Sequence, residues 1–245
     1  GDSRVEKNDH VKWVYSPLLD VASKFHLWAN LLTHDLSEIV TLIKQNDVVY
    51  IPRLAYPLIP VAKRYGKKVV VHLHDYQPLS CCAAVFPNSK TADTGLLRDM
   101  KISLQYEFNS TNSLQRACMF SLGAPFNQIC KRWLEYSDEI ICVSERQRQI
   151  VKDALPQLAN KLTTIHNPLP EQALIKKELS ANKPSILFMG GDSYAKGFDT
   201  FLSASQRILK RGAKVEFNLT RNVNQKNRLM LERLSQRFDG GYNIF

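Results

Sequence analysis

The sequence lacks several features that would assign it to a specialised class of protein. It has no run of about 18 apolar residues, so no transmembrane helix is expected. The first residues lack the apolar core of a signal peptide, which argues for the cytoplasm, although residue 1 is not Met. The five cysteines are an odd number and match no zinc spacing, which favours free thiols in a reducing compartment.

What is present is an ordinary globular composition with an excess of positive charge. The 245 residues are 44% hydrophobic and 23% charged, with a net charge of +10, and this length suits two domains. Between residues 201 and 237, nine Lys or Arg accompany two Glu, which gives +7 by subtraction. Such a cluster favours an anionic partner, namely a nucleotide diphosphate, an anionic membrane surface or a nucleic acid, and the alternative is a solvated helix face.

Short β-branched segments alternate with amphipathic segments along the chain. We expect strands at residues 11–15, 48–51, 68–74, 139–143, 161–165, 185–189, 215–219 and from 242 onward. We expect helices at residues 18–44 with a break near 34–35, and at 56–65, 114–122, 125–136, 145–155, 199–211 and 225–238. The strand at 68–74 is apolar enough to be buried on both faces, and residues 75–95 should form a long loop.

Strand–helix–strand alternation predicts parallel sheets with right-handed crossovers, and it occurs twice around a proline-containing segment. The fold class is therefore α/β, with two Rossmann-like domains at residues 1–168 and 169–245. The second domain has only three strands, about half of a full Rossmann-like domain, and it ends on a strand with an unpaired edge. We expect the polypeptide to continue past Phe245, and the first domain to lack its first strand and helix.

In open parallel sheets, ligands bind at the carboxyl ends of the strands, and histidines occupy one such end. Alternation places His72 and His74 on the same side of the strand at 68–74, with His74 at its exit. A histidine there can hydrogen-bond a sugar hydroxyl or a phosphate oxygen, whereas His72 is interpreted as structural. Metal binding by His72, His74 and Asp75 would use suitable ligand types, but no fourth ligand is visible, so no metal is predicted.

A glycine turn follows the first strand of the second domain. Gly190 and Gly191 let backbone N–H groups approach a phosphate, the next helix adds its N-terminal dipole, and Lys196 adds a positive charge. The pattern is neither G-x-G-x-x-G nor a Walker A loop, so an ordinary strand–helix turn is the alternative.

Four segments together resemble glycosyltransferase family 4 of the GT-B fold. They are VVVHLHD at 69–75, SDEIICVS at 137–144, TIHNP at 164–168, and ILFMGG running to KGFD at 186–199. Their order and spacing match that family along most of the chain. The resemblance implies an enzyme that transfers a sugar, with retention, from a nucleotide-sugar donor to a glycan or lipid-linked acceptor. It implies no cofactor and no obligatory metal.

The resemblance also implies roles for five residues. His74 would lie near the transferred sugar, and Asn167 would lie at the interdomain hinge. Gly190 and Gly191 would face the donor diphosphate, and Lys196 would neutralise it. This role suits a leaving nucleotide diphosphate, because negative charge develops there in the transition state.

The sequence departs from the family pattern in three places. Many members carry Arg directly after the first glycine of the turn, where this chain has Gly191. The family's Glu-x7-Glu segment, which binds the donor, should lie beyond Phe245. The glycine-rich loop after the family's first strand is absent.

These departures leave other functions open. The chain would then be an inactive or truncated GT-B binding domain, or an epimerase or phosphorylase-like enzyme on the same fold. The charge would also suit a nucleic-acid-binding α/β protein. No nucleic-acid-binding module is recognisable, however, so no nucleic acid is expected as a partner. The basic clusters further predict peripheral contact with the anionic inner face of a membrane, where a lipid-linked acceptor would be found.

Overall fold

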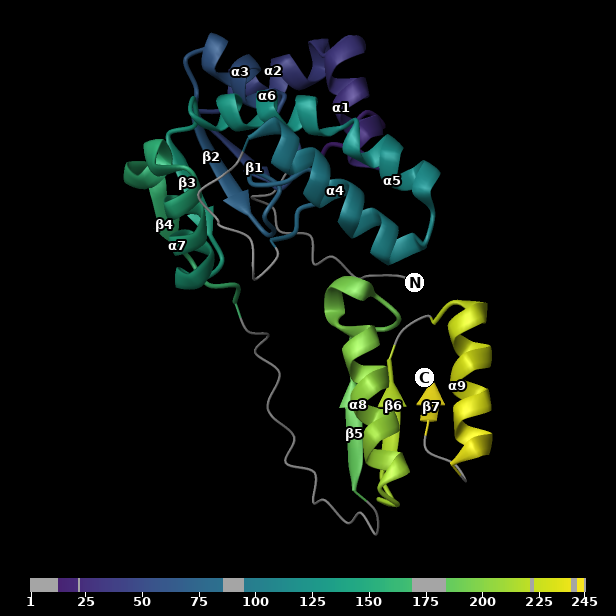
Figure 1. The fold of residues 1–245 in the computed structure, drawn as a ribbon. Helices are drawn as coiled ribbons and strands as arrows, with labels where there is room; N and C mark the ends of the chain where they lie inside the picture. The colour runs from purple at the N-terminus through teal and green to yellow at the C-terminus, as the bar shows by residue number, and fades with distance from the viewer. Residues whose placement is uncertain are drawn as a thin grey trace. The chain divides into compact units, whose positions relative to one another are not determined.

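The computed structural model describes residues 13–21, 23–85, 95–168, 184–220, 223–238 and 242–244 (Figure 1). The chain divides into two compact units, the first comprising Gly1–Leu104 and Cys118–Asn167, and the second comprising Gln105–Ala117 and Pro168–Phe245. A parallel sheet with helices in its crossovers organises each unit, which confirms the α/β class. The domain boundary at residue 168 stays a prediction, because residues 169–183 lie outside the described ranges.

The first sheet has four parallel strands whose spatial order follows the chain: β1 (Val48–Pro52), β2 (Lys68–Leu73), β3 (Glu139–Cys142) and β4 (Leu162–Thr164). The crossovers contain α3 (Leu58–Arg64), α4 (Leu96–Thr111), α5 (Leu114–Ser121), α6 (Ala124–Leu134), α7 (Glu145–Ala154) and the short η1 (Pro156–Lys161). Before β1 come α1 (Lys24–Thr33) and α2 (Ser37–Gln45), separated at the predicted break. Parallel strands in chain order are joined by crossovers that all pass in one direction, and the usual right-handed crossover then brings the connecting helices to one face of the sheet.

The burial of β2 shows which face this is. Val69, Val71 and Leu73 are fully buried in the core, whereas Val70 and His72 on the other face are half-buried. The expectation that this strand is buried on both faces is therefore wrong for the described part of the chain. The reason is the strand order, which collects the crossover helices on a single face.

Asp138 joins the amino ends of β2 and β3. Its carboxylate accepts hydrogen bonds from the Val69 N–H at 2.7 Å and from the Lys63 ammonium at 2.9 Å. Burial acts to raise the pKa of Asp138, but the bonds from Lys63 and Val69 outweigh it and lower that pKa. The polar start of the segment at 137–144 thus has a structural role in the sheet.

Helix α4 was not predicted, because its buried face carries polar side chains and its exposed face carries apolar ones. The side chains of Asp99, Ser103 and Glu107, spaced four residues apart, are buried, whereas Leu97 is 82% exposed. An apolar stripe at helical spacing, the usual signal for a buried helix face, is thus missing from the inward side.

The strand predicted at residues 11–15 is absent from its described part. Trp13, Val14 and Tyr15 have no regular secondary structure, and their side chains are exposed, while residues 11 and 12 lie outside the described ranges. A β-branched and aromatic run fits a strand only where a neighbouring strand pairs with it, so local composition was misleading here.

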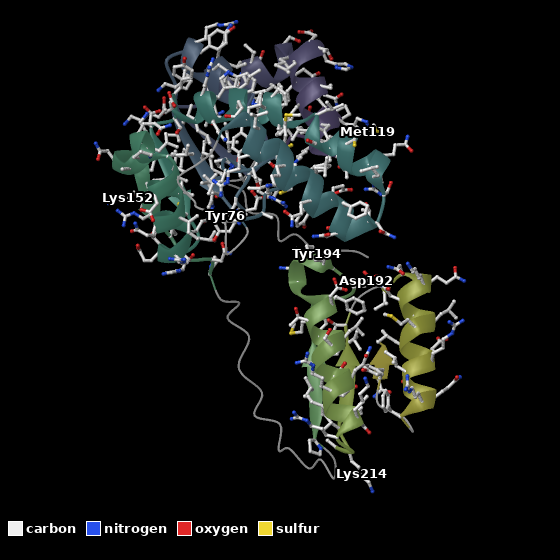
Figure 2. All side chains as sticks on the ribbon, viewed as in Figure 1. Tyr76, Met119, Lys152, Asp192, Tyr194 and Lys214 are labelled. Atoms are coloured by element: carbon white, nitrogen blue, oxygen red, sulfur yellow. The ribbon has the colours of Figure 1, made fainter. Side chains whose placement is uncertain are left out.

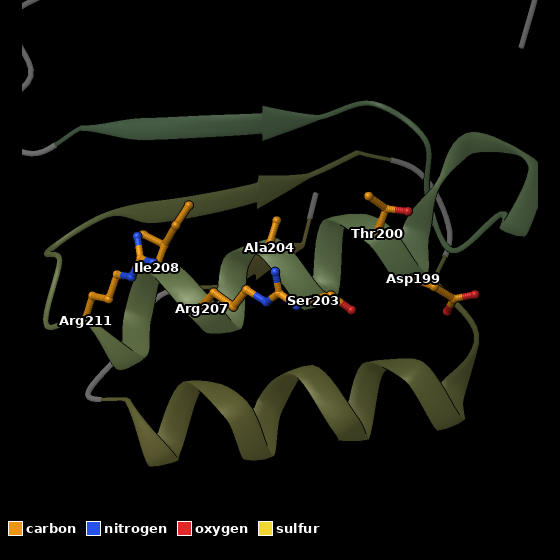
Figure 3. A pocket seen from close by; sticks show the side chains of 7 residues that line it. All are labelled: Asp199, Thr200, Ser203, Ala204, Arg207, Ile208 and Arg211. Carbon is orange, nitrogen blue, oxygen red and sulfur yellow. The ribbon is translucent and has the colours of Figure 1, made fainter.

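The second sheet has three parallel strands in chain order: β5 (Ser185–Phe188), β6 (Glu216–Leu219) and β7 (Tyr242–Ile244). The short η2 (Tyr194–Lys196) leads into α8 (Phe198–Lys210), and α9 (Gln225–Arg237) connects β6 to β7. Both long helices lie on the same side of the sheet (Figure 3). Between helices and sheet, the ring centroids of Phe188 and Phe201 are 4.5 Å apart, and those of Phe217 and Tyr242 are 5.4 Å apart.

All five cysteines are free thiols, as predicted, and all but Cys118 are buried. Burial raises the pKa of Cys81 and of Cys142 to about 11, so these thiols stay protonated and unreactive at neutral pH. Within the described ranges, no helix combines the length and the apolar character needed to cross a bilayer.

Candidate functional site

The carboxyl edge of the first sheet carries an ion pair where two strands end. Arg53 directly follows β1 and has a positive φ of 68°, a conformation that costs a non-glycine residue about 1 kcal/mol or more. Its N–H donates to the His72 carbonyl at 3.0 Å, and its guanidinium lies 3.3 Å from the Asp75 carboxylate. The strained backbone therefore directs a cation toward the exit of β2, and sequence reasoning had no signal for it, because Arg53 belongs to no motif.

The two histidines of β2 lie together on the open face of this sheet. Their ring centroids are 4.2 Å apart with an interplanar angle of 34°, which confirms that His72 and His74 share one side of the strand. His74 is exposed, whereas His72 is half-buried with its Nδ1 2.5 Å from the Tyr50 hydroxyl on β1. Burial lowers the pKa of His72, and the nearby His74 lowers it further. His72 is thus neutral at pH 7.

Gln147, in the first turn of α7, links the exits of β2 and β3. This buried side chain accepts from the Val143 N–H at 2.8 Å and donates to the Asp75 carbonyl at 3.0 Å. Ser144 caps α7 by accepting from the Gln147 N–H, as its residue type predicts. The backbone beside His74 is therefore held from two sides.

The loop after β2 rests on a buried polar network centred on Asp99. Its carboxylate accepts from the Cys81 N–H at 2.6 Å, the Asn127 amide at 2.8 Å and the Ser103 hydroxyl at 3.3 Å. The Asn127 side chain in turn accepts from Gln77 at 2.7 Å, and Gln77 accepts from the Lys24 ammonium at 3.1 Å. A buried carboxylate with this many donors fixes the loop conformation, because losing any donor leaves a polar group unpaired.

In the second unit, the glycine turn lies at the carboxyl end of β5 and leads through η2 into α8. Gly191 has φ +58°, and a Cβ on Gly190 would come within 2.8 Å of the Lys196 Cβ. Among the described residues, the N–H groups of Gly191, Asp192 and Ser193 donate no hydrogen bond, and no carboxylate pairs with the exposed Lys196. The turn thus offers unpaired donors beside a cation, as an anion site requires.

The Asp192 side chain fixes this turn to the start of α9. Its Oδ2 accepts from the Asn224 N–H at 2.8 Å and the Asn227 amide at 3.1 Å, and the Asn224 side chain also donates to it. Asn224 itself caps α9 by accepting from the Asn227 N–H. Sequence reasoning missed this link, because the residues lie more than thirty positions apart.

A groove of about 630 Å³ follows the outer face of α8 (Figure 3). Its lining residues all come from this one helix and its C-cap residue, so the groove is shallow. None of them comes from the glycine turn: Asp199, Thr200, Ser203, Ala204, Arg207, Ile208 and Arg211. The groove therefore does not coincide with either strand edge that carries the candidate residues.

The predicted site residues fall into two groups. His74 follows β2, and the exposed Asn167 follows β4 at the same carboxyl edge of the first sheet. Gly190, Gly191 and Lys196 form one turn in the second unit. Within the described ranges, no cluster of three or more His, Cys, Asp or Glu side chains could hold a metal ion.

Comparison with known proteins adds information on the fold. No family model matches the chain, and no curated protein matches it. Among solved structures, the chain is similar to OtsA in its apo form, a protein of the GT-B fold, with 16% sequence identity and a TM-score of 0.50. The match covers 89% of this chain and 52% of OtsA, so the chain spans about half the length of that protein.

This likeness includes both units, because the unmatched 11% of the chain is smaller than either of them. At this identity the likeness concerns the fold alone. The fold is thus α/β with Rossmann-like units of the GT-B type, as the strand–helix alternation and the family resemblance had predicted.

Proposed function

We propose that this chain is a retaining glycosyltransferase of family 4 that moves a sugar from a nucleotide-sugar donor to a glycan or lipid-linked acceptor. The observation that carries the proposal is the glycine turn at the carboxyl end of a parallel strand. Its N–H groups, which have no acceptor in the described part of the chain, lie beside Lys196. Proteins of this fold class bind ligands at such strand ends. OtsA, the solved structure of similar fold, is a glycosyltransferase.

The residues would divide the reaction between them. The N–H groups of the turn and Lys196 would bind the donor diphosphate and stabilise the charge that develops on it as the sugar leaves. His74 would hydrogen-bond the transferred sugar, and Asn167 would lie at the hinge. Arg53, whose guanidinium pairs with Asp75 one residue after His74, would add a cation at the carboxyl edge of the first sheet.

Titration with UDP-glucose and GDP-mannose tests this proposal. We expect at least one of them to bind, and an oligonucleotide to leave that binding unchanged. Lys196→Ala should weaken binding about tenfold or more, because hydrogen bonds to charged groups contribute about 1.5–3 kcal/mol. The matched control is Lys214→Ala, since this exposed lysine lies at the opposite end of the same unit from Asp192 and Tyr194 (Figure 2). Equal losses in the two variants would refute the site.

The alternative of an inactive binding domain is favoured if a nucleotide sugar binds but no sugar is released or transferred. The same titration separates the nucleic-acid alternative, because an oligonucleotide would then compete with the nucleotide sugar. Among the described residues, the positive charge is the one feature that favours nucleic-acid binding, and no feature favours an inactive domain over an enzyme.

Contact with an anionic membrane is part of the proposal, and the hairpin of α4 and α5 supports it. The hairpin closes through the Ser121 hydroxyl, which donates to the Met100 carbonyl at 2.9 Å. Leu97, Met119 and Leu122 are 65–82% exposed, whereas both acidic residues of the hairpin are buried. Its exposed side is therefore apolar and basic, as in segments that lie at anionic lipid surfaces.

Sedimentation with vesicles tests this contact. We expect the chain to pellet with vesicles of anionic lipid at low salt and not with neutral vesicles. Leu97→Ser with Leu122→Ser should reduce binding about tenfold or more, at roughly 0.8 kcal/mol per buried CH₂. Leu32→Ser, which changes a 53% exposed leucine on α1, is the control. An unchanged bound fraction in the double variant would refute the hairpin as the contact surface.

A further inference from the structure

A tyrosine and two histidines form a chain of contacts on the open face of the first sheet, and the proposed reaction uses only the last of them. We infer that Tyr50 and His72 are positioning residues, which fix the ring of His74 and restrict the charge that the histidine pair carries. The inference rests on the proposed role of His74, and its test below does not require turnover.

The strand register brings the first two residues together. In the parallel pairing of β1 with β2, Tyr50 lies opposite Val70 and Pro52 lies opposite His72, so Tyr50 and His72 are diagonal neighbours on one face. The Tyr50 hydroxyl lies 2.5 Å from His72 Nδ1, and the two rings meet edge to face at 6.0 Å. Residue 72 thus has a partner on the neighbouring strand that restricts rotation of its ring.

This bond selects a tautomer of His72. A phenol is the natural donor to an unprotonated ring nitrogen, so Nδ1 accepts and Nε2 carries the proton of the neutral imidazole. Nε2 is buried and has no hydrogen-bond partner among the described residues. A second proton on this ring would therefore place a charge against the Tyr50 contact, with no acceptor at the other nitrogen.

The His72 ring in turn packs against His74. With centroids 4.2 Å apart, the rings are in contact, and the otherwise exposed His74 side chain has one face covered. Such a contact limits the rotamers of His74 before any ligand arrives, which lowers the entropy lost on binding. A histidine at a strand exit without this support would have to be ordered by the ligand itself.

The charges around the pair reinforce the effect. Arg53 and Asp75, at the exits of β1 and β2, neutralise each other at 3.3 Å, and Glu139 on β3 is hydrogen-bonded to Thr163 on β4. Neither carboxylate is therefore free to stabilise an imidazolium at His72. His72 therefore stays neutral near neutral pH.

The test uses ¹⁵N signals of the histidine rings, which report the tautomer and the protonation state directly, recorded on the ligand-free chain. We expect His72 to be neutral with its proton on Nε2. Tyr50→Phe should mix the tautomers of His72, and His72→Gln should shift the His74 signals and broaden them through rotamer exchange. Tyr136→Phe is the matched control, since Tyr136 is as exposed as Tyr50 (58% against 52%). The inference is overturned if His74 signals are unchanged in His72→Gln, or if His72 carries its proton on Nδ1.

A second measurement separates this inference from the proposed function. In titrations with UDP-glucose and GDP-mannose, Tyr50→Phe and His72→Gln should each weaken binding or turnover roughly 2- to 10-fold, the range for losing one net hydrogen bond. A substitution that merely destabilised the fold would not alter the pH dependence of this binding, whereas these two should. If neither nucleotide sugar binds the unmodified chain, the proposed function fails, and the ring signals still decide whether His72 positions His74.

Discussion

The two sheets present different chemistry at their carboxyl edges. The first sheet presents side chains, namely the Arg53–Asp75 ion pair and the stacked imidazoles of His72 and His74. The second presents mainly backbone, in the turn at Gly190 and Gly191. Side chains need support that fixes their rotamers, whereas a backbone turn needs only the glycine conformations and an anchored end.

The interiors of the two units match this difference. The first unit has a broad core that includes residues of every strand of its sheet, together with the Asp99 network beneath the loop that follows His74. The second has a small described core around Leu219 and Leu231, extended by an aromatic group that includes Phe217. A side-chain site therefore coincides with the more elaborate support.

The largest expected effect concerns the small core of the second unit. Phe217→Ala removes a ring that is 1% exposed, and should reduce the free energy of unfolding by about 3–5 kcal/mol. Hydrogen exchange should show that β5 and β6 lose protection, whereas β1 and β2 keep theirs. Leu229→Ala, at a half-exposed position of α9, should change stability by less than about 0.5 kcal/mol. Equal loss of protection in both sheets would show that the units unfold together.

The next effect concerns the buried carboxylate of the first unit. Asp99→Ala leaves three donors unpaired and should reduce the free energy of unfolding by about 2–4 kcal/mol, as measured by urea denaturation. The exposed Asp47, changed to Ala, provides the control. A loss no greater than in Asp47→Ala would show that the network does not stabilise the loop.

A smaller effect distinguishes backbone from side-chain recognition. Gly190→Ala would place a Cβ 2.6 Å from the Phe188 ring, so the turn must shift at about 1–3 kcal/mol of strain. Gly66→Ala meets no atom within 4 Å, and its φ of +67° costs about 1 kcal/mol. Nucleotide-sugar affinity should fall in the first variant only. Loss of affinity in both would indicate general destabilisation.

The smallest effect is the pH dependence that His72 contributes. Its pKa is lowered in the folded chain, so the folded state favours the neutral ring. This contribution is complete above the unfolded-state pKa near 6.5 and is lost as pH falls through that value and below. Urea midpoints should therefore decrease slightly from pH 7 to pH 5, and less so in His72→Gln. An equal decrease in both proteins would assign the dependence to other groups.

Much of the fold followed from local pattern, because the alternation of β-branched and amphipathic segments is a property of neighbouring residues. The break between α1 and α2, the strands β1 to β3, and the cap at Ser144 all appeared where composition and spacing predicted them. Helix α4 was the failure, because burying Asp99, Ser103 and Glu107 requires partners from other segments. Helix prediction from periodicity relies on the spacing of apolar residues, so a helix whose buried face is polar is not detected.

The sequence by itself determined the parallel α/β class and the positions of His74 and the glycine turn at strand ends, since both depend on the order of short segments. Only the tertiary structure decided that Tyr50 contacts His72, that Arg53 meets Asp75, and that Asp192 holds the start of α9. These contacts join residues 22 to 32 positions apart, and strand register and backbone strain bring them together. Contacts between residues so far apart in the sequence depend on how whole strands and helices pack, and a local sequence pattern contains no information about that packing.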